Sequence, residues 1–152
     1  MRRYFFDTSA LVKHYHAEFG TPEVRGLLTE PGAESVISRI ATVEMLSGFA
    51  GKVRTGALSA AGFTTLRGRF LADVKRRVVR PVRVINAHYQ VASVLISHHG
   101  MIRQLRTLDA IQLAVALRLH QAASINHFVC ADQRLCDVAT AEGLAVFNPE
   151  QP

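Results

Sequence analysis

The sequence of 152 residues has no tryptophan, only two cysteines and no long uninterrupted apolar run. Its longest mostly apolar stretch, 108–119, is broken by two charged residues and a glutamine, whereas a membrane-spanning helix needs about 18 or more apolar residues. This excludes a membrane protein. Cys130 and Cys136 lack the C-x-x-C spacing of a redox or zinc site, so neither a disulfide framework nor a zinc site is expected.

Length and composition indicate one folded unit. Hydrophobic residues make up 49% of the chain and charged residues 20%, and a domain of this length buries roughly 68–70% of its unfolded surface. Met1-Arg2-Arg3 is basic, but only three apolar residues follow before Asp7, whereas a secretory signal needs about 7–15. We therefore expect a single cytoplasmic domain over residues 1–152.

Basic residues are concentrated in one segment. The net charge is +6, with a pI near 10.0, yet the segment from Lys52 to Arg83 carries +8 and the remainder −2. Most of the basic residues are Arg, whose planar guanidinium binds phosphate through two hydrogen bonds. We expect this segment to contact RNA, and a solvated helix face is the alternative. Within this segment we assign RNA binding to Lys75, Arg76, Arg77 and Arg80.

Short apolar runs alternate with helical patterns along the chain. Strands are predicted at 4–6, 35–38, 82–85, 127–131 and 145–147. The alternation is typical of an α/β fold with a mostly parallel central sheet and helices on both faces. Two consecutive helices, at about 40–53 and 59–79, have no strand between them. We expect them to form a projecting helical hairpin, with Pro81 ending the second helix.

Two carboxylates directly follow predicted strands. Asp7 follows the strand at 4–6, and Asp132 follows the strand at 127–131. Both therefore fall at the carboxyl ends of strands, where open parallel sheets bind ligands. Each alone can also be a helix N-cap, a role that contributes about 0.5–2 kcal/mol.

Two further carboxylates lie on predicted helices. Glu44 shares a helix face with small residues, and Asp109 lies in the first turn of a strongly apolar helix. A surface position for Glu44 and a helix-dipole interaction for Asp109 are the alternatives. If these two converge with Asp7 and Asp132, their mutual repulsion requires divalent cations, and oxygen ligands favour Mg²⁺ or Mn²⁺. Such ions support phosphodiester cleavage.

Four motifs make the sequence similar to one family. They are YFFDTSAL at 4–11, the helical Glu44, LDAIQLA at 108–114 and FVCADQRL at 128–135. In this order they resemble the PIN-domain ribonucleases, and nearly the whole chain resembles the VapC-type toxins within that family. The resemblance implies a PIN-like three-layer α/β sandwich.

The resemblance also implies an activity. It assigns Asp7, Glu44, Asp109 and Asp132 as catalytic residues and ligands of Mg²⁺ or Mn²⁺, and Ser9 as an assisting hydrogen-bonding residue. The implied enzyme is a metal-dependent endoribonuclease that leaves a 5′-phosphate and a 3′-hydroxyl. As a toxin it would form a homodimer and be neutralised by a cognate VapB-like antitoxin whose tail occupies the active-site groove.

Parts of the sequence are compatible with other functions. Haloacid-dehalogenase-like phosphatases also carry an Asp after the first strand, but they need a second Asp two residues later, where this chain has Ser9. A non-catalytic RNA-binding or partner-binding module with the same fold is a second alternative. The presence of all four acids favours the enzyme. Cys130 departs from the family pattern, in which Thr or Ser often precedes Ala-Asp, so this position supplies a thiol instead of a hydroxyl.

Overall fold

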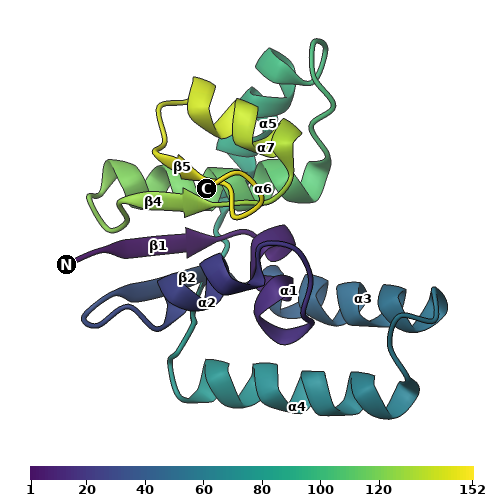
Figure 1. The fold of residues 1–152 in the computed structure, drawn as a ribbon. Coiled ribbons are helices and arrows are strands. Elements are labelled where there is room, and N and C mark those ends of the chain that lie inside the picture. The colour runs from purple at the N-terminus through teal and green to yellow at the C-terminus, as the bar shows by residue number, and fades with distance from the viewer.

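The computed structural model describes residues 1–152 and contains five strands and seven helices (Figure 1). None of the helices has the length and hydropathy that a membrane span needs. The strands are β1 (Arg3–Phe6), β2 (Glu34–Ser38), β3 (Arg80–Val82), β4 (His127–Val129) and β5 (Val146–Phe147). The helices are α1 (Thr8–Tyr15), α2 (Thr21–Leu28), α3 (Ala41–Arg54), α4 (Ala60–Lys75), α5 (Asn86–His99), α6 (Thr107–Gln121) and α7 (Gln133–Ala141).

All five strands run parallel in one sheet of order β3-β2-β1-β4-β5. β1 is central, and its Phe5 lies beside Val36 of β2 and Phe128 of β4. Parallel neighbours require crossover connections, which here place helices on both faces of the sheet. The predicted α/β sandwich is therefore confirmed, and the carboxyl ends of the strands meet at one edge.

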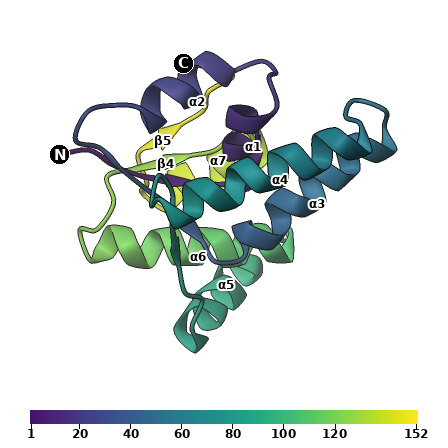
Figure 2. The same ribbon diagram turned by 90° about the horizontal axis from the view of Figure 1, so that it is seen from below.

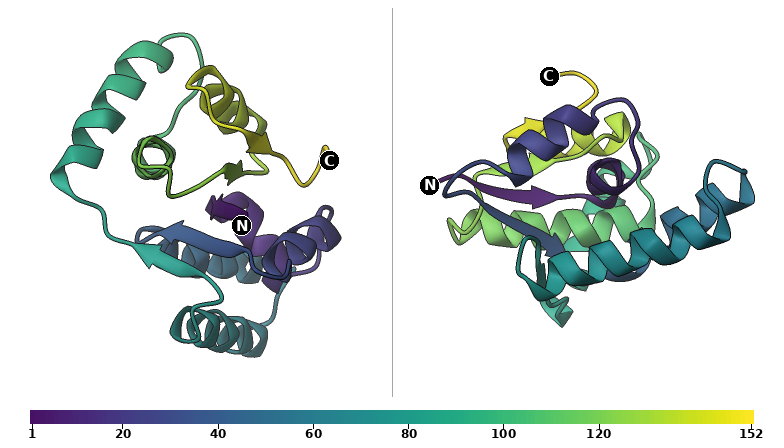
Figure 3. Two further views of the ribbon diagram at one scale, coloured as in Figure 1. Left: turned by 90° about the vertical axis from the view of Figure 1, so that its left-hand side faces the viewer. Right: turned by 60° about the horizontal axis from the view of Figure 1, so that its bottom comes forward.

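Alternate side chains of β1 enter two separate cores. Phe5 packs in a core with α5, α6 and α7, while Tyr4 and Phe6 pack in a core with α1, α3 and α4. Full burial of one such aromatic side chain contributes about 1.5–3 kcal/mol. Figure 3 shows α4 and α5 as the outer helices, α4 against α3 and α5 against α6. These two cores hold β1 and the residue that follows it in place.

Helices α3 and α4 form the predicted helical hairpin. Figure 2 shows them side by side, with their connection at 55–59 extending beyond the sheet. Gly56 makes this turn possible because it adopts a φ of 78°, a conformation that costs glycine little. The side chain of Ser59 caps α4, and Phe70 of α4 packs edge-on against Tyr15 of α1 at a centroid distance of 5.5 Å. The hairpin is thereby anchored on α1.

The second helix of the hairpin is shorter than predicted. It ends at Lys75 rather than near Val79 because the chain reverses at Arg77, which has a φ of 62°. Left-handed backbone conformation at a non-glycine residue is uncommon and stops a helix.

The strand after the hairpin lies earlier than predicted. It runs from Arg80 to Val82 instead of 82–85, and Pro81 lies inside it rather than ending a helix. β3 is the edge strand, where the missing N–H of proline is tolerated because one side of the strand has no hydrogen-bonding neighbour.

Candidate active site

A cavity of about 830 Å³ opens between α1, α3 and α6, at the carboxyl edge of the sheet. Asp7, Glu44 and Asp109 line this cavity, which we call the acidic pocket. Asp132 does not line it and lies beside it. Three of the four predicted carboxylates therefore meet in one pocket, although they are up to 102 positions apart in the chain.

Asp7 follows β1 and caps α1. Its Oδ2 accepts hydrogen bonds from the Ser9 N–H at 2.9 Å and the Ser9 hydroxyl at 2.6 Å. The residue is only 3% exposed, and its Oδ1 is buried without a hydrogen-bond partner. Burial raises the pKa of Asp7 above its ordinary value, against the Ser9 hydrogen bonds, and the charge of Asp109 adds to the rise. Because a buried, partly unpaired carboxylate is costly, helix capping alone does not account for Asp7.

Ser9 connects α1 to the segment after β4. Its hydroxyl donates to Asp7 and accepts a hydrogen bond from the Ala131 N–H at 3.0 Å. The Cys130 thiol lies 3.6 Å from the same hydroxyl. Ser9 thus fixes the orientation of the Asp7 carboxylate, and Cys130 fills the space beside it.

Glu44 is held in the acidic pocket by residues of α1 and α6. Its Oε2 accepts hydrogen bonds from the Thr8 hydroxyl at 2.9 Å and from the Gln112 side-chain amide. Partial burial raises the pKa of Glu44, the Thr8 hydrogen bond opposes this rise, and the charges of Asp7 and Asp109 add to it. Glu44 is therefore a pocket residue and not the exposed surface residue considered as an alternative.

Gln112 is a completely buried polar residue of α6. Its amide nitrogen donates to Glu44 and to the Thr8 hydroxyl at 3.2 Å, while its Oε1 is buried without a partner. In the sequence it is only a polar interruption of an apolar helix. Its position three residues after Asp109, on the same helix face, is the signal that could have assigned it to the site.

Arg106 is a pocket residue that the sequence motifs did not reveal. Its Nε donates to Asp109 Oδ2 at 2.8 Å, and its Nη2 lies 3.5 Å from Asp132 Oδ2. The Arg106 side chain is 67% exposed, so these ion pairs add little to folding stability. Asp132 also caps α7 by accepting the Arg134 N–H at 3.0 Å. Arg106 is thus the link between Asp132 and the acidic pocket.

The acidic pocket offers the oxygen ligands that a hard divalent cation prefers, but its carboxylates are not already arranged around one metal position. Carboxylate oxygens are the ligands that Mg²⁺ and Mn²⁺ prefer, and Asp7 Oδ1 has no protein partner. No three acidic, histidine or cysteine side chains, however, are close enough together to form a metal site. Glu44 and Asp109 are instead hydrogen-bonded to Gln112 and Arg106. A bound cation would have to replace Gln112 as the partner of Glu44 and Arg106 as the partner of Asp109.

The basic segment is distributed over different parts of the surface. Lys52 and Arg54 of α3 line the acidic pocket, and Arg83 lines a neighbouring cavity. The four residues expected to bind RNA do not line the acidic pocket and occupy the end of α4 and the start of β3: Lys75, Arg76, Arg77 and Arg80.

The arrangement of strands, helices and pocket is that of a known domain. Residues 4–141 match the family described as PIN domain. The chain belongs to the PIN-domain family. A search of curated protein sequences gives no significant match.

Solved structures share the fold of this PIN domain at low sequence identity. VapC20 of Mycobacterium tuberculosis, described as a toxin that cleaves the sarcin–ricin loop, is 17% identical with a TM-score of 0.66, covering 93% of this chain and 96% of its own. A toxin–antitoxin complex from Klebsiella pneumoniae is 16% identical with a TM-score of 0.61, covering 95% and 96%. VapBC-1 of nontypeable Haemophilus influenzae is 18% identical with a TM-score of 0.61, covering 97% and 98%. At these identities the likeness establishes the fold.

Proposed function

We propose that this PIN domain is a metal-dependent endoribonuclease. The observation that carries the proposal is the buried Asp7 carboxylate, whose Oδ1 lacks a protein partner in a pocket shared with Glu44 and Asp109. Three negative charges in one partly desolvated pocket are favourable only when cations offset them. The RNA-cleaving description of VapC20, a protein of the same fold, supports RNA as the substrate.

The pocket residues divide into ligands and supporting groups. Asp7, Glu44 and Asp109 would hold Mg²⁺ or Mn²⁺, with Asp132 at the margin, and the bound ion would supply an activated water and charge neutralisation at the phosphate. Ser9 orients Asp7 through its hydroxyl. Hydrolysis of this kind leaves a 5′-phosphate and a 3′-hydroxyl.

Removal of divalent cations tests this function. A mixed-sequence RNA should be cleaved in the presence of Mn²⁺ or Mg²⁺, remain intact in EDTA, and be cleaved again after excess Mn²⁺ is added. Gel analysis of end-labelled RNA measures the result. Cleavage that persists in EDTA would exclude the metal mechanism.

The second candidate is a non-catalytic module that binds RNA or a protein. The observation that favours it is the pairing of Asp109 with Arg106, which leaves no ready metal cage. The same assay separates the two, because a module would bind the labelled RNA in Mn²⁺ without shortening it.

We further propose that the enzyme is the toxin of a toxin–antitoxin pair. The support is the fold it shares with VapC20 and with the toxin–antitoxin complexes of Klebsiella pneumoniae and Haemophilus influenzae. A cognate VapB-like antitoxin would neutralise it by occupying the acidic pocket. RNA and antitoxin would both be cytoplasmic, and we place the activity of this single domain there.

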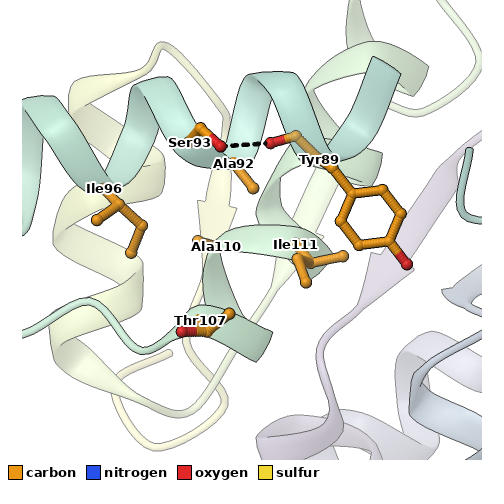
Figure 4. A pocket seen from close by; sticks show the side chains of 7 residues that line it. All are labelled: Tyr89, Ala92, Ser93, Ile96, Thr107, Ala110 and Ile111. Atoms are coloured by element: carbon orange, nitrogen blue, oxygen red, sulfur yellow. Dashed lines mark hydrogen bonds between the residues drawn. The ribbon is translucent and has the colours of Figure 1, made fainter. Parts of the chain in front are cut away.

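A homodimer is part of the same proposal, and the outer face of α5 and α6 is the surface that supports it. Figure 4 shows a shallow cavity of about 280 Å³ between these helices, lined mostly by apolar side chains such as Ala92, Ile96 and Ile111. Tyr89 at its rim is 51% exposed, and Ile96 is 36% exposed. Contiguous exposed apolar surface of this kind marks interaction sites.

Replacing Ile96 with Glu should therefore shift the protein from dimer to monomer. The charge would be placed in the centre of the apolar face, where it has no partner. Light scattering after size-exclusion chromatography measures the mass. Phe19→Glu, at an exposed apolar residue between α1 and α2, is the matched control and should leave the dimer intact. A dimer unchanged by Ile96→Glu would place the contact elsewhere.

We also propose that the basic end of α4 contacts RNA outside the acidic pocket. Lys75, Arg76, Arg77 and Arg80 are all exposed and form no ion pair. Replacing Arg76, Arg77 and Arg80 with Gln should reduce the slope of log affinity against log salt by about 0.7 for each lost phosphate contact. Fluorescence anisotropy with labelled RNA at several salt concentrations measures this slope. An unchanged slope would assign these residues to a solvated face.

A further inference from the structure

A second cavity adjoins the acidic pocket at the first turn of α3. It has a volume of about 710 Å³, and Ile40 and Val43 line both cavities, so the two share a wall. We call it the arginine groove; its lining residues are Arg39, Ile40, Thr42, Val43, Arg83 and Val84.

The sheet places two arginines side by side in this groove. Arg39 follows β2 and Arg83 follows β3, and the last residues of these strands, Ser38 and Val82, are paired in register. The Arg39 N–H donates to the Val82 carbonyl at 2.8 Å, which holds the two chain segments together beyond the strands. The positive charges of Arg39 and Arg83 therefore repel each other, which is destabilising.

Neither groove arginine is neutralised within the protein. No carboxylate lies within ion-pair distance of Arg39 or Arg83, whereas Lys52 pairs with Glu18 at 2.8 Å. Both arginines are exposed. Two unpaired arginines that line one hollow form a site for an anion with several phosphates, because each guanidinium can bind a phosphate through two hydrogen bonds.

Two other features of the groove favour a polynucleotide. The amino terminus of α3 opens into it, and its N-cap residue Ile40 offers no side-chain acceptor, so the positive end of the helix dipole adds to the attraction. Val43, on the wall shared with the acidic pocket, is 68% exposed. It provides apolar surface for a ribose or base between a phosphate in the acidic pocket and those in the groove.

We propose that the arginine groove binds the backbone phosphates of single-stranded RNA next to the cleaved bond, with Arg39 and Arg83 as the phosphate ligands. This inference rests on the proposed ribonuclease function and assigns the path of its substrate. The strand crosses the wall formed by Ile40 and Val43 and continues along the carboxyl ends of β2 and β3.

The test measures RNA binding and cleavage separately. Binding of a fluorescein-labelled single-stranded RNA is followed by anisotropy at several salt concentrations, with Asp7→Asn in every protein so that the probe stays intact. Combining Arg39→Gln with Arg83→Gln should reduce the salt slope by about 1.4, since single strands lose about 0.7 per phosphate contact, and weaken binding at 0.1 M salt about 10-fold. Arg39→Lys with Arg83→Lys should restore most of the slope because it retains the charge.

The matched control removes the same charge elsewhere. Arg103 and Arg118 lie outside the basic segment, are exposed, form no ion pair and line neither cavity. Arg103→Gln with Arg118→Gln should leave slope and affinity close to those of the parent. Circular dichroism melting curves confirm that all variants are folded.

Cleavage kinetics separate positioning from chemistry. With Asp7 intact and Mn²⁺ present, the groove variant should raise KM for a long RNA about 10-fold and leave kcat within about 2-fold, because charge-dependent binding is lost while the acidic pocket is unchanged.

Other outcomes would overturn the inference in distinguishable ways. If the unmodified enzyme cleaves RNA and the groove variant matches the control, the groove inference fails and the ribonuclease function stands. If the groove variant binds RNA normally but loses binding to a poly-glutamate peptide, the groove is a docking site for an acidic protein. If the unmodified protein neither binds nor cleaves RNA, the proposed function itself fails.

Discussion

Replacing Asp7 with Asn is expected to lower RNA cleavage by about 10²–10⁴-fold and to make the metal-free protein more stable. The loss follows because Asp7 is the most buried of the three pocket carboxylates and a metal-bound reaction centre supplies several kcal/mol of stabilisation. The gain in stability follows because asparagine retains an acceptor for the Ser9 hydrogen bonds and removes a buried charge. About 1–2 kcal/mol is expected, which corresponds to roughly 3–6 °C for a chain of this size.

The pH dependence of that gain has a definite sign. The pKa of Asp7 in the folded protein lies above its ordinary value of 3.8, so between these two values the folded state binds more protons than the unfolded state. The stability that Asp7 contributes is therefore greatest in its protonated form and falls as the pH rises through the folded pKa. In EDTA, the melting temperature of the Asp7→Asn variant should rise relative to that of the parent as the pH increases from about 4.

Added Mn²⁺ should reverse the order of stability. Under the proposed function the cation should bind the parent and raise its melting temperature, and it should stabilise the Asp7→Asn variant much less. Asp137→Asn, at an exposed acid on α7, is the matched control and should change neither cleavage nor the response to Mn²⁺. Full cleavage by Asp7→Asn would contradict the assignment of the site.

Replacing Gln112 with Leu is expected to lower cleavage by about 10–100-fold, the usual cost of losing a group that orients a metal ligand. Gln112 donates to Glu44 and shares Thr8 with it, so its loss leaves the Glu44 carboxylate with one hydrogen-bond donor. The ionised form of Glu44 then has less support in its half-buried position. The fold should persist because leucine has a similar volume and suits the apolar surroundings of α6.

A positioning role for Gln112 predicts a particular kinetic pattern. The Gln112→Leu variant should need a higher Mn²⁺ concentration for half-maximal cleavage, and excess Mn²⁺ should restore part of the rate. Gln121→Leu, at the exposed end of the same helix, is the matched control and should behave as the parent. An unchanged Mn²⁺ requirement would mean that Thr8 alone positions Glu44.

The sequence predicts the acidic pocket well because its main determinants are local. Asp7 follows a short apolar run suited to a buried strand, and Asp109 lies in the first turn of a helix that is too apolar to be exposed. A parallel sheet brings strand ends to one edge whatever the length of the connections. That the strand ends carrying Asp7 and Asp132 meet at one edge therefore follows from the alternation of strands and helices, whereas the strand order β3-β2-β1-β4-β5 is known only from the structure.

The partners of the acids depend on tertiary distances that periodicity does not encode. Arg106, the N-cap residue of α6, pairs with Asp109 three positions later, but its approach to Asp132 depends on how α6 and α7 are placed. The sequence likewise does not show which part of the surface the basic residues from Lys52 to Arg83 occupy. In the structure, Lys52 lines the acidic pocket, Arg83 lines the arginine groove, and Lys75 lies at the end of α4.

The central position of β1 also determines when the acidic pocket can be completed during synthesis of the chain. β1 needs β4 as a neighbour, and Ser9 finds its partner Ala131 only 122 residues later in the chain. Contacts between such distant residues form late in folding. A nascent chain thus leaves the ribosome before Asp7 has all of its supporting contacts, and the hydrogen bond between Ser9 and Ala131 can form only when β4 and the residues after it have emerged. The acidic pocket is therefore completed only after β4 has been synthesised, and the cleavage that we propose for it cannot precede that step.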